Sequence, residues 1–247
     1  MEELIRLYID MIEKIENSKL NTRGENLTCL FNMKGNLYNG DIMIVGRAVN
    51  GWDDAFWKHG DLRDRNTIRK HVQKIMSISE NLTECPLNWV NESWGRVEYD
   101  EKGKVKYNSK KSAFWRLVNK IVSKIANEEF WWSKIVWTNI YKIAPDEGGN
   151  PKNKLIDIQY ENCVKILSAE IELYKPKHIV FFTGLDWVKP FVKDIEKITL
   201  SSNKVNSLVE AIGNYNFNDG KKANIIIAKH PQGKPEEKML EEILNYW

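Results

Sequence analysis

The chain has 247 residues, of which 42% are hydrophobic and 29% charged, a composition typical of a folded globular protein rather than a disordered one. Its net charge of +3 permits a nucleic-acid partner without requiring one. The acidic N-terminus lacks the order of a signal peptide, and no apolar run approaches the roughly 20 residues of a membrane span. We therefore expect a cytoplasmic protein that makes no use of a membrane.

The first part of the chain alternates helix-like and strand-like patterns. Apolar residues recur at helical spacing over 2–16 and 66–77, which predicts two amphipathic helices. Between them, DIMIVG at 41–46 is an apolar run that ends in glycine and predicts a strand buried on both faces. Residues 47–65 show no clean periodicity, so we expect a long loop of functional character.

A basic region follows in the middle of the chain. Residues 81–111 are irregular, and their DEKGK stretch suggests a hairpin or an exposed excursion. Residues 112–127 then carry the clearest helical stripe of the sequence. Between 101 and 125 there are eight Lys or Arg and one Glu. This region presents either a solvated helix face or a row of cations that faces phosphates.

The last part of the chain again mixes strands and helices. The patterns predict, in order, a strand over 135–145, a helix over 157–175, a strand over 178–184, a short helix from Trp187, a hairpin over 208–229 with an Asp219-Gly220 turn, and a helix from Pro235 to Trp247. Continuous apolar strands are typical of parallel sheets covered on both faces. We predict one α/β domain over 1–247, a three-layer α/β/α sandwich with a central, mostly parallel sheet of four strands.

The three cysteines, Cys29, Cys85 and Cys163, lie far apart and form no CxxC pair. Metal and redox sites usually show closely spaced cysteines, so we interpret these as reduced thiols. We expect no cofactor, no structural metal and no iron–sulfur cluster, and the sequence indicates no obligate protein partner.

Polar segments follow the predicted strands. In an open parallel sheet, ligands bind beyond the carboxyl ends of the strands. The segments in those places are GRAVNGW at 46–52, TNIYK at 138–142, TGLD at 183–186 and KHPQGK at 229–234. We therefore expect the loop 46–54, Asn139 and His230 to converge on a single hollow.

Four segments, in this order, resemble the uracil-DNA glycosylase superfamily. VGRAVNG stands where the family has its catalytic loop, and VWTNIYKIAP is similar to the TNxVKCxPP stretch of some branches. KPKHIVFFTG is similar to the family's PKxIVxLG, and KHPQG stands where the family has His-Pro-Ser or a close relative. The resemblance is strongest over 40–235. It implies a DNA partner and a nucleotide that is flipped out of the helix into a pocket.

The resemblance also implies roles for single side chains. Asn139 would read the edge of the flipped base, because an amide offers a donor and an acceptor together. His230 would donate to a base oxygen and stabilise the negative charge that the leaving base gathers. Trp52 or Phe56 would stack on the base. The alternative roles are structural: a histidine that caps a turn, an asparagine bonded to a neighbouring loop, and aromatic rings in the core.

The first loop departs from the family pattern. Arg47 and Ala48 stand where family branches keep a carboxylate or an amide that places the attacking water. A cation beside the developing oxocarbenium ion is unfavourable for hydrolysis and suits an anionic ligand instead. Asn50 and Asp53 lie nearby and are the candidates for placing the water.

A set of polar and cationic residues is predicted to contact the phosphate backbone. It comprises Arg47, Lys229, Gln232, Lys234, Arg116, Lys120 and Lys124. Two functions remain open on the predicted fold: hydrolysis of the N-glycosidic bond of uracil or a related base, and recognition of a nucleotide or nucleic acid without cleavage. An unrelated α/β hydrolase or nucleotide binder is a third.

Overall fold

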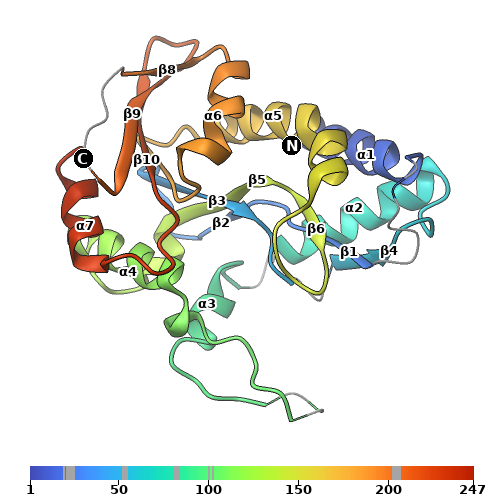
Figure 1. The fold of residues 1–247 in the computed structure, drawn as a ribbon, viewed down its shortest axis with the longest axis horizontal. Helices are drawn as coiled ribbons and strands as arrows, with labels where there is room; N and C mark the ends of the chain where they lie inside the picture. The colour runs from blue at the N-terminus through green and yellow to red at the C-terminus, as the bar shows by residue number, and fades with distance from the viewer. Residues whose placement is uncertain are drawn as a thin grey trace.

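The computed structural model describes residues 1–18, 20, 26–51, 55–79, 84–99, 101, 103–201 and 207–247. Within them a sheet of seven strands forms the centre of the molecule, in the order β2-β5-β3-β7-β10-β9-β8 (Figure 1). The strands are β2 (Met33–Lys34), β3 (Ile42–Ala48), β5 (Ile135–Tyr141), β7 (His178–Phe181), β8 (Ile198–Leu200), β9 (Val209–Asn216) and β10 (Lys222–Ala228).

The predicted four-stranded sheet is thus too small. The four middle strands, β5, β3, β7 and β10, are parallel to one another, as the apolar runs indicated. The sheet continues on both sides through antiparallel strands, with β2 beside β5 and with β9 and β8 beyond β10. The predicted hairpin over 208–229 is confirmed as β9 and β10.

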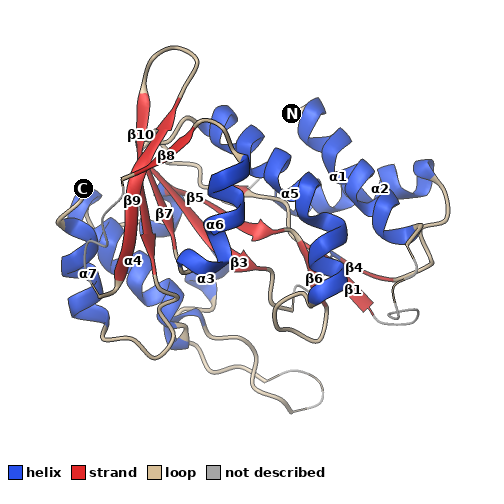
Figure 2. Ribbon diagram, turned by 45° about the horizontal axis from the view of Figure 1, so that its top comes forward, coloured by secondary structure: helices blue, strands red, loops and turns tan. Residues whose placement is uncertain are grey.

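Helices cover both faces of this sheet (Figures 1 and 2). The helices are α1 (Glu2–Glu16), α2 (Arg65–Ser79), α3 (Asn88–Glu92), α4 (Ala113–Ala126), α5 (Asn153–Tyr174), α6 (Leu185–Asp194) and α7 (Glu236–Leu244). The helices α1, α2, α5 and α6 contribute to one apolar core, and α3, α4 and α7 to the other. The three layers are those predicted.

Successive side chains along a central strand belong alternately to the two apolar cores. In β3, Met43 and Val45 belong to the core under α1 and α5, whereas Ile42 and Ile44 belong to the core under α4. Successive side chains of a strand point to opposite faces, so a strand covered on both sides has to be apolar throughout. This is why the four residues Ile42 to Val45 of β3 are all apolar and buried.

A second sheet was not predicted from the sequence. Among the described residues it has three antiparallel strands, with β1 (Asn26–Cys29) between β4 (Phe56–Lys58) and β6 (Ile143–Pro145). The strand β6 follows β5 after a single residue, Lys142, so the chain passes directly from one sheet to the other.

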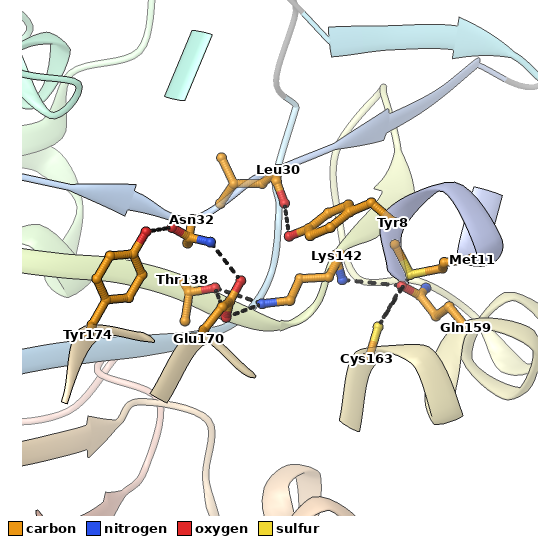
Figure 3. Close-up of polar contacts among 10 residues, drawn as sticks. All are labelled: Tyr8, Met11, Leu30, Asn32, Thr138, Lys142, Gln159, Cys163, Glu170 and Tyr174. Atoms are coloured by element: carbon orange, nitrogen blue, oxygen red, sulfur yellow. Dashed lines mark hydrogen bonds and ion pairs between the residues drawn. The ribbon is translucent and has the colours of Figure 1, made fainter. Parts of the chain in front are cut away.

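Lys142 lies in a buried polar network between the two sheets and α5 (Figure 3). Its Nζ atom donates to Glu170 Oε2 at 2.8 Å and to Thr138 Oγ1 at 2.7 Å, and both charged side chains are fully buried. Asn32 donates to the other carboxylate oxygen of Glu170 at 3.1 Å, and Tyr174 donates to Asn32. The Glu170 carboxylate therefore accepts hydrogen bonds at both oxygens, as a buried charge requires.

In the part of the chain that the structure describes, no helix has the length and apolar character needed to cross a lipid bilayer.

Candidate active site

A cavity of about 830 Å³ opens at the carboxyl ends of the central strands. Three chain segments line it: Gly46 to Gly51 at the end of β3 and in the loop that follows, Asn139 in β5, and His230 with Gln232 after β10. The predicted convergence of these segments on one hollow is what the structure shows. Its remaining described lining residues are Trp89, Lys106, Tyr107, Asn108, Lys111, Ser112, Phe114, Trp115, Trp137, Gly149 and Asn150.

Asn139 and Gly46 are partners in the parallel pairing of β5 with β3. The Asn139 side chain crosses toward β3, and its Oδ1 atom occupies the space where a Cβ on residue 46 would lie. Asn139 is only 2% exposed, and its Nδ2 atom is buried without a hydrogen-bond partner. Buried donors nearly always have a partner, so this unpartnered amide nitrogen is unusual among buried polar groups.

His230 lies on the turn that ends β10. Its Nδ1 atom accepts the backbone N–H of Gln232 at 3.3 Å, which leaves the proton of the neutral ring on Nε2. Burial lowers the pKa of His230, and the nearby positive charge of Arg47 lowers this pKa further. The imidazole is therefore neutral near pH 7 and offers one N–H donor.

Arg47 joins the ends of two strands. Its Nε atom donates to the carbonyl oxygen of Thr183, after β7, at 2.7 Å, and its guanidinium lies 5.1 Å from the ring centre of Trp187. Burial lowers the pKa of Arg47, whereas the negative charge of Glu210 raises it. Arg47 thus brings a fixed positive charge to the cavity wall, with part of its hydrogen-bonding capacity already used.

Asn50 holds two loops together at the rim. Its Oδ1 atom accepts the backbone N–H of Gly149 at 2.7 Å, which ties the loop after β3 to the loop after β6. An amide oxygen has two lone pairs, so Asn50 can accept one further hydrogen bond. Asp53 and Trp52, the other predicted residues of this loop, lie outside the described residues.

The aromatic residues of the cavity differ from those predicted. Phe56 is half exposed on β4 in the small sheet and is not among the described residues that line the cavity. The rings of Tyr107 and Phe114 line it instead, beside a cluster of Trp89, Trp115 and Trp137 with ring centres 5.1 to 5.7 Å apart. Phe114 fits the helical stripe of α4, so its pattern indicated only a core residue.

The row of cations predicted on α4 does not face the cavity. Arg116 donates to Glu236 of α7 through Nε at 2.8 Å, and Lys120 donates to Glu237 at 2.6 Å. Lys124 is next in sequence to Ile125, which lines a small second cavity together with Asp41. Asp41 precedes β3, so this second cavity lies at the amino end of the strand, whereas the large cavity lies at its carboxyl end. Helix α4 therefore uses its basic face to bind α7.

Other cations do reach the cavity. Lys106 and Lys111, from the segment before α4, line it together with the predicted Gln232. Lys229 and Lys234 flank His230 in sequence, half buried and exposed respectively, but neither is among the described lining residues. The positive charge at the cavity is thus on the excursion and on Arg47 rather than on the helix.

Comparison with protein families gives one match that decides the family. The model of the uracil DNA glycosylase superfamily matches residues 92–247, more than half of the chain. The chain belongs to the uracil DNA glycosylase superfamily. The resemblance seen in the sequence is therefore confirmed, and a search of curated proteins gives no significant match.

The family match covers only part of the cavity lining. It contains Asn139 and His230 but not the loop at 46–51, which is the loop that departs from the glycosylase superfamily's pattern. The base-facing side of the site therefore lies within the superfamily match, whereas the side that carries Arg47 and Asn50 lies outside it. Among the described residues, no group of three or more His, Cys, Asp or Glu side chains is arranged to hold a metal ion.

The contact between Gly46 and Asn139 leads to a testable expectation. Gly46→Ala places a methyl group where the Asn139 carboxamide lies. Because the obstructing atom is the end of a side chain rather than backbone, we expect the amide to rotate, with a change in the free energy of unfolding below about 1.5 kcal/mol. We expect base release to fall about as far as it does in Asn139→Ala.

A double-mutant cycle checks this expectation, with base release and thermal unfolding as readouts. If Gly46 acts through Asn139, the loss in the double variant equals that of Asn139→Ala alone, since the two effects are not additive. Fully additive losses would contradict the proposed contact.

Proposed function

We propose that this protein is a DNA glycosylase that hydrolyses the N-glycosidic bond of uracil or a related altered base. The observation that carries the proposal is the buried, unpartnered Nδ2 atom of Asn139 in the cavity that also contains His230. This amide and the ring N–H of His230, in a hollow lined by aromatic rings, suit a flat base with carbonyl groups on its edge.

The Asn139 carboxamide is suited to a pyrimidine edge. An unpaired buried donor costs about 1–3 kcal/mol, and a carbonyl oxygen of a bound base would remove that cost. The amide oxygen of the same side chain can accept from the base N–H that neighbours this carbonyl. Binding of a base with adjacent acceptor and donor groups is thereby favoured over an apolar ligand.

His230 is suited to stabilise the leaving base. When the glycosidic bond breaks, the bonding electrons stay on the base, which becomes an anion, and the sugar carbon becomes an oxocarbenium ion that water attacks. A neutral imidazole that carries its proton on Nε2 can donate to a base oxygen without giving the proton up. The buried position strengthens this hydrogen bond relative to one in water.

The water-placing group is proposed on the first loop. Among the described residues that line the cavity there is no Asp or Glu, so Asn50 is the described residue suited to hold the water. Asp53 remains the alternative proposal. Placement by a neutral amide predicts slower hydrolysis than placement by a carboxylate, because the amide removes no proton and carries no negative charge to stabilise the oxocarbenium ion.

A second function is favoured by Arg47. A half-buried cation beside the cavity repels an oxocarbenium ion and attracts a phosphate. On this ground the protein would bind a flipped nucleotide or a nucleic acid without cleaving it. The two functions share the base-facing residues and differ in what happens at the sugar.

Release of free base from uracil-containing DNA separates the two functions. We expect the purified protein, in excess over single- or double-stranded substrate, to release uracil over minutes to hours. Binding that is tight and salt-dependent, with no base released, would support recognition without cleavage and would contradict the proposed glycosylase.

Lys111 allows the phosphate contacts to be tested separately. It is exposed at the cavity rim, whereas Lys120 is bound to Glu236 and Glu237. We expect Lys111→Gln to reduce the slope of log affinity against log salt by about 0.9, the value for one phosphate contact, and Lys120→Gln to leave it unchanged. Equal slopes for Lys111→Gln and the unmodified protein would contradict a phosphate contact at Lys111.

A further inference from the structure

Two chain arms project from the body of the molecule beside the cavity (Figures 1 and 2). We name the described residues 96–99 and 103–107 the excursion arms. They face each other through an antiparallel bridge between Tyr99 and Val105, and Lys106 N–H donates to the carbonyl oxygen of Glu98 at 2.8 Å.

The excursion arms expose an unusual share of apolar surface. Nine large hydrophobic side chains are exposed among the described residues, and four of them are on these arms. They are Val97 (59% exposed), Tyr99 (61%), Val105 (46%) and Tyr107 (54%). Single exposed apolar residues are ordinary, but a group of this size on one projecting element indicates a binding surface.

The base of the arms is fixed. The Oδ1 atom of Asn108 accepts the N–H groups of Gly95 and Lys110, both at 3.1 Å, and its Nδ2 atom donates to the carbonyl oxygen of Arg96 at 2.6 Å. Asn108 is itself buried and lines the cavity. The direction in which the arms leave the molecule is therefore set by the same residue that forms part of the cavity wall.

The chemistry of the arms suits a polyanion with stacked rings. Arg96, Lys104 and Lys106 lie on them together with one carboxylate, Glu98, which forms an exposed ion pair with Lys106 at 3.6 Å. Lys106 and Tyr107 belong both to the arms and to the cavity lining, so the apolar surface continues into the site. Cations beside exposed aromatic and β-branched side chains are typical of nucleic-acid contacts and less so of an apolar protein interface.

The opposite rim lacks an apolar side chain that could enter a base stack. The turn after His230 consists of Pro231, which is buried, followed by Gln232, Gly233 and Lys234. A nucleotide that leaves a duplex leaves a gap, and proteins commonly fill such gaps with an apolar or aromatic side chain. Around the described part of this cavity, the excursion arms carry the side chains for that purpose.

We propose that the excursion arms insert Tyr99 and Val105 into the base stack of a DNA duplex whose target nucleotide occupies the cavity. This inference rests on the proposed function and names its substrate form, a duplex rather than a single strand. The inserted side chains fill the place of the flipped base and slow its return. Lys106 and Arg96 neutralise the adjacent phosphates.

The test compares Tyr99→Ser/Val105→Ser with a control of matched exposure, Leu37→Ser/Leu173→Ser, whose side chains are 53% and 44% exposed on other elements. The probes are a DNA duplex that contains uracil beside the fluorescent base analogue 2-aminopurine, and the same strand alone. Fluorescence of the analogue rises when its neighbour leaves the stack, so it reports opening of the duplex even without cleavage.

We expect the arm variant to bind the duplex about tenfold more weakly, or more, and to lose the fluorescence rise, because stacking of a side chain on a base contributes about 1–3 kcal/mol. Binding to the single strand should change less than about twofold, because no base pair has to open. The control variant should match the unmodified protein in both assays.

Four results would overturn the inference. Three of them are a fluorescence rise in the arm variant equal to that of the control, an equal loss on duplex and single strand, and absence of any rise when the unmodified protein binds the duplex. If no base is released by any variant, the proposed hydrolysis fails, while the fluorescence comparison still decides the role of the arms. Binding of a protein but not of DNA through the arms would also overturn it.

Discussion

His230→Ala is expected to slow base release by about two to three orders of magnitude, the usual loss when one donor to a developing anion is removed. The Nε2–H group is the donor, because Nδ1 is engaged with the N–H of Gln232. Single-turnover assays with enzyme in excess measure this step directly. Binding of the intact substrate should weaken far less, because the charge on the base develops only as the bond breaks.

The pH profile gives a second readout of His230. Its pKa lies below the ordinary value because of burial and the charge of Arg47. The ring is therefore neutral, and active in the proposed role, at neutral pH, and activity falls as pH decreases through the lowered pKa. Arg47→Gln removes a repelling charge, so it should raise this pKa and move the acidic limb of the profile to higher pH.

Lys234→Ala is the matched control for His230→Ala. Lys234 lies exposed on the same turn and is not among the described lining residues of the cavity. We expect its rate of base release to stay within about threefold of the unmodified protein, as is usual for loss of one exposed charge. If His230→Ala released base at the unmodified rate, the assignment of His230 as the donor would be wrong.

Lys142→Ala is expected to lower the free energy of unfolding by about 3–5 kcal/mol, because it leaves the Glu170 carboxylate buried without its cation. Figure 3 shows Thr138 and Asn32 bonded to the Glu170 carboxylate, and the side chains of the pair are fully buried. Chemical denaturation followed by circular dichroism measures the change. A loss of this size is a large share of the total stability of an ordinary domain.

Lys14→Ala provides the comparison for an exposed ion pair. Lys14 binds Glu161 at the same 2.8 Å, but these side chains are 48% and 69% exposed, and such pairs contribute about 1 kcal/mol or less. Replacement of both buried partners, as in Lys142→Met/Glu170→Leu, should recover much of the loss, since no charge is then left unpaired. Equal destabilisation by Lys14→Ala and Lys142→Ala would contradict this account.

The long elements could be predicted from the sequence, and the short ones could not. Each central strand lies between helices on two faces, so its sequence is mostly apolar and recognisable by itself. Strands such as β2 and β8 have two and three residues, too few for any period to show. Their place at the sheet edge depends on the strand with which they pair. This is why β2 and β8 were missed, whereas β9, with eight residues, was already part of the predicted hairpin.

The cavity was predicted only in part for a related reason. Asn139 and His230 could be brought together because parallel strands end at one rim, which is a property of the sheet itself. Tyr107 and Phe114 reach the same rim from an excursion and from the start of a helix, whose placement depends on packing. Likewise, the sequence offers no sign that Arg116 meets Glu236, 120 residues away along the chain.

Neighbouring residues of β5 serve different layers of the molecule. Thr138 faces the buried Glu170, whereas Asn139 faces the cavity. A substitution at position 139 thus alters the chemistry offered to a ligand and leaves the scaffold beneath it unchanged. On the proposed function, the preference for one base over another can drift at position 139 while selection for a folded protein acts on the adjacent position.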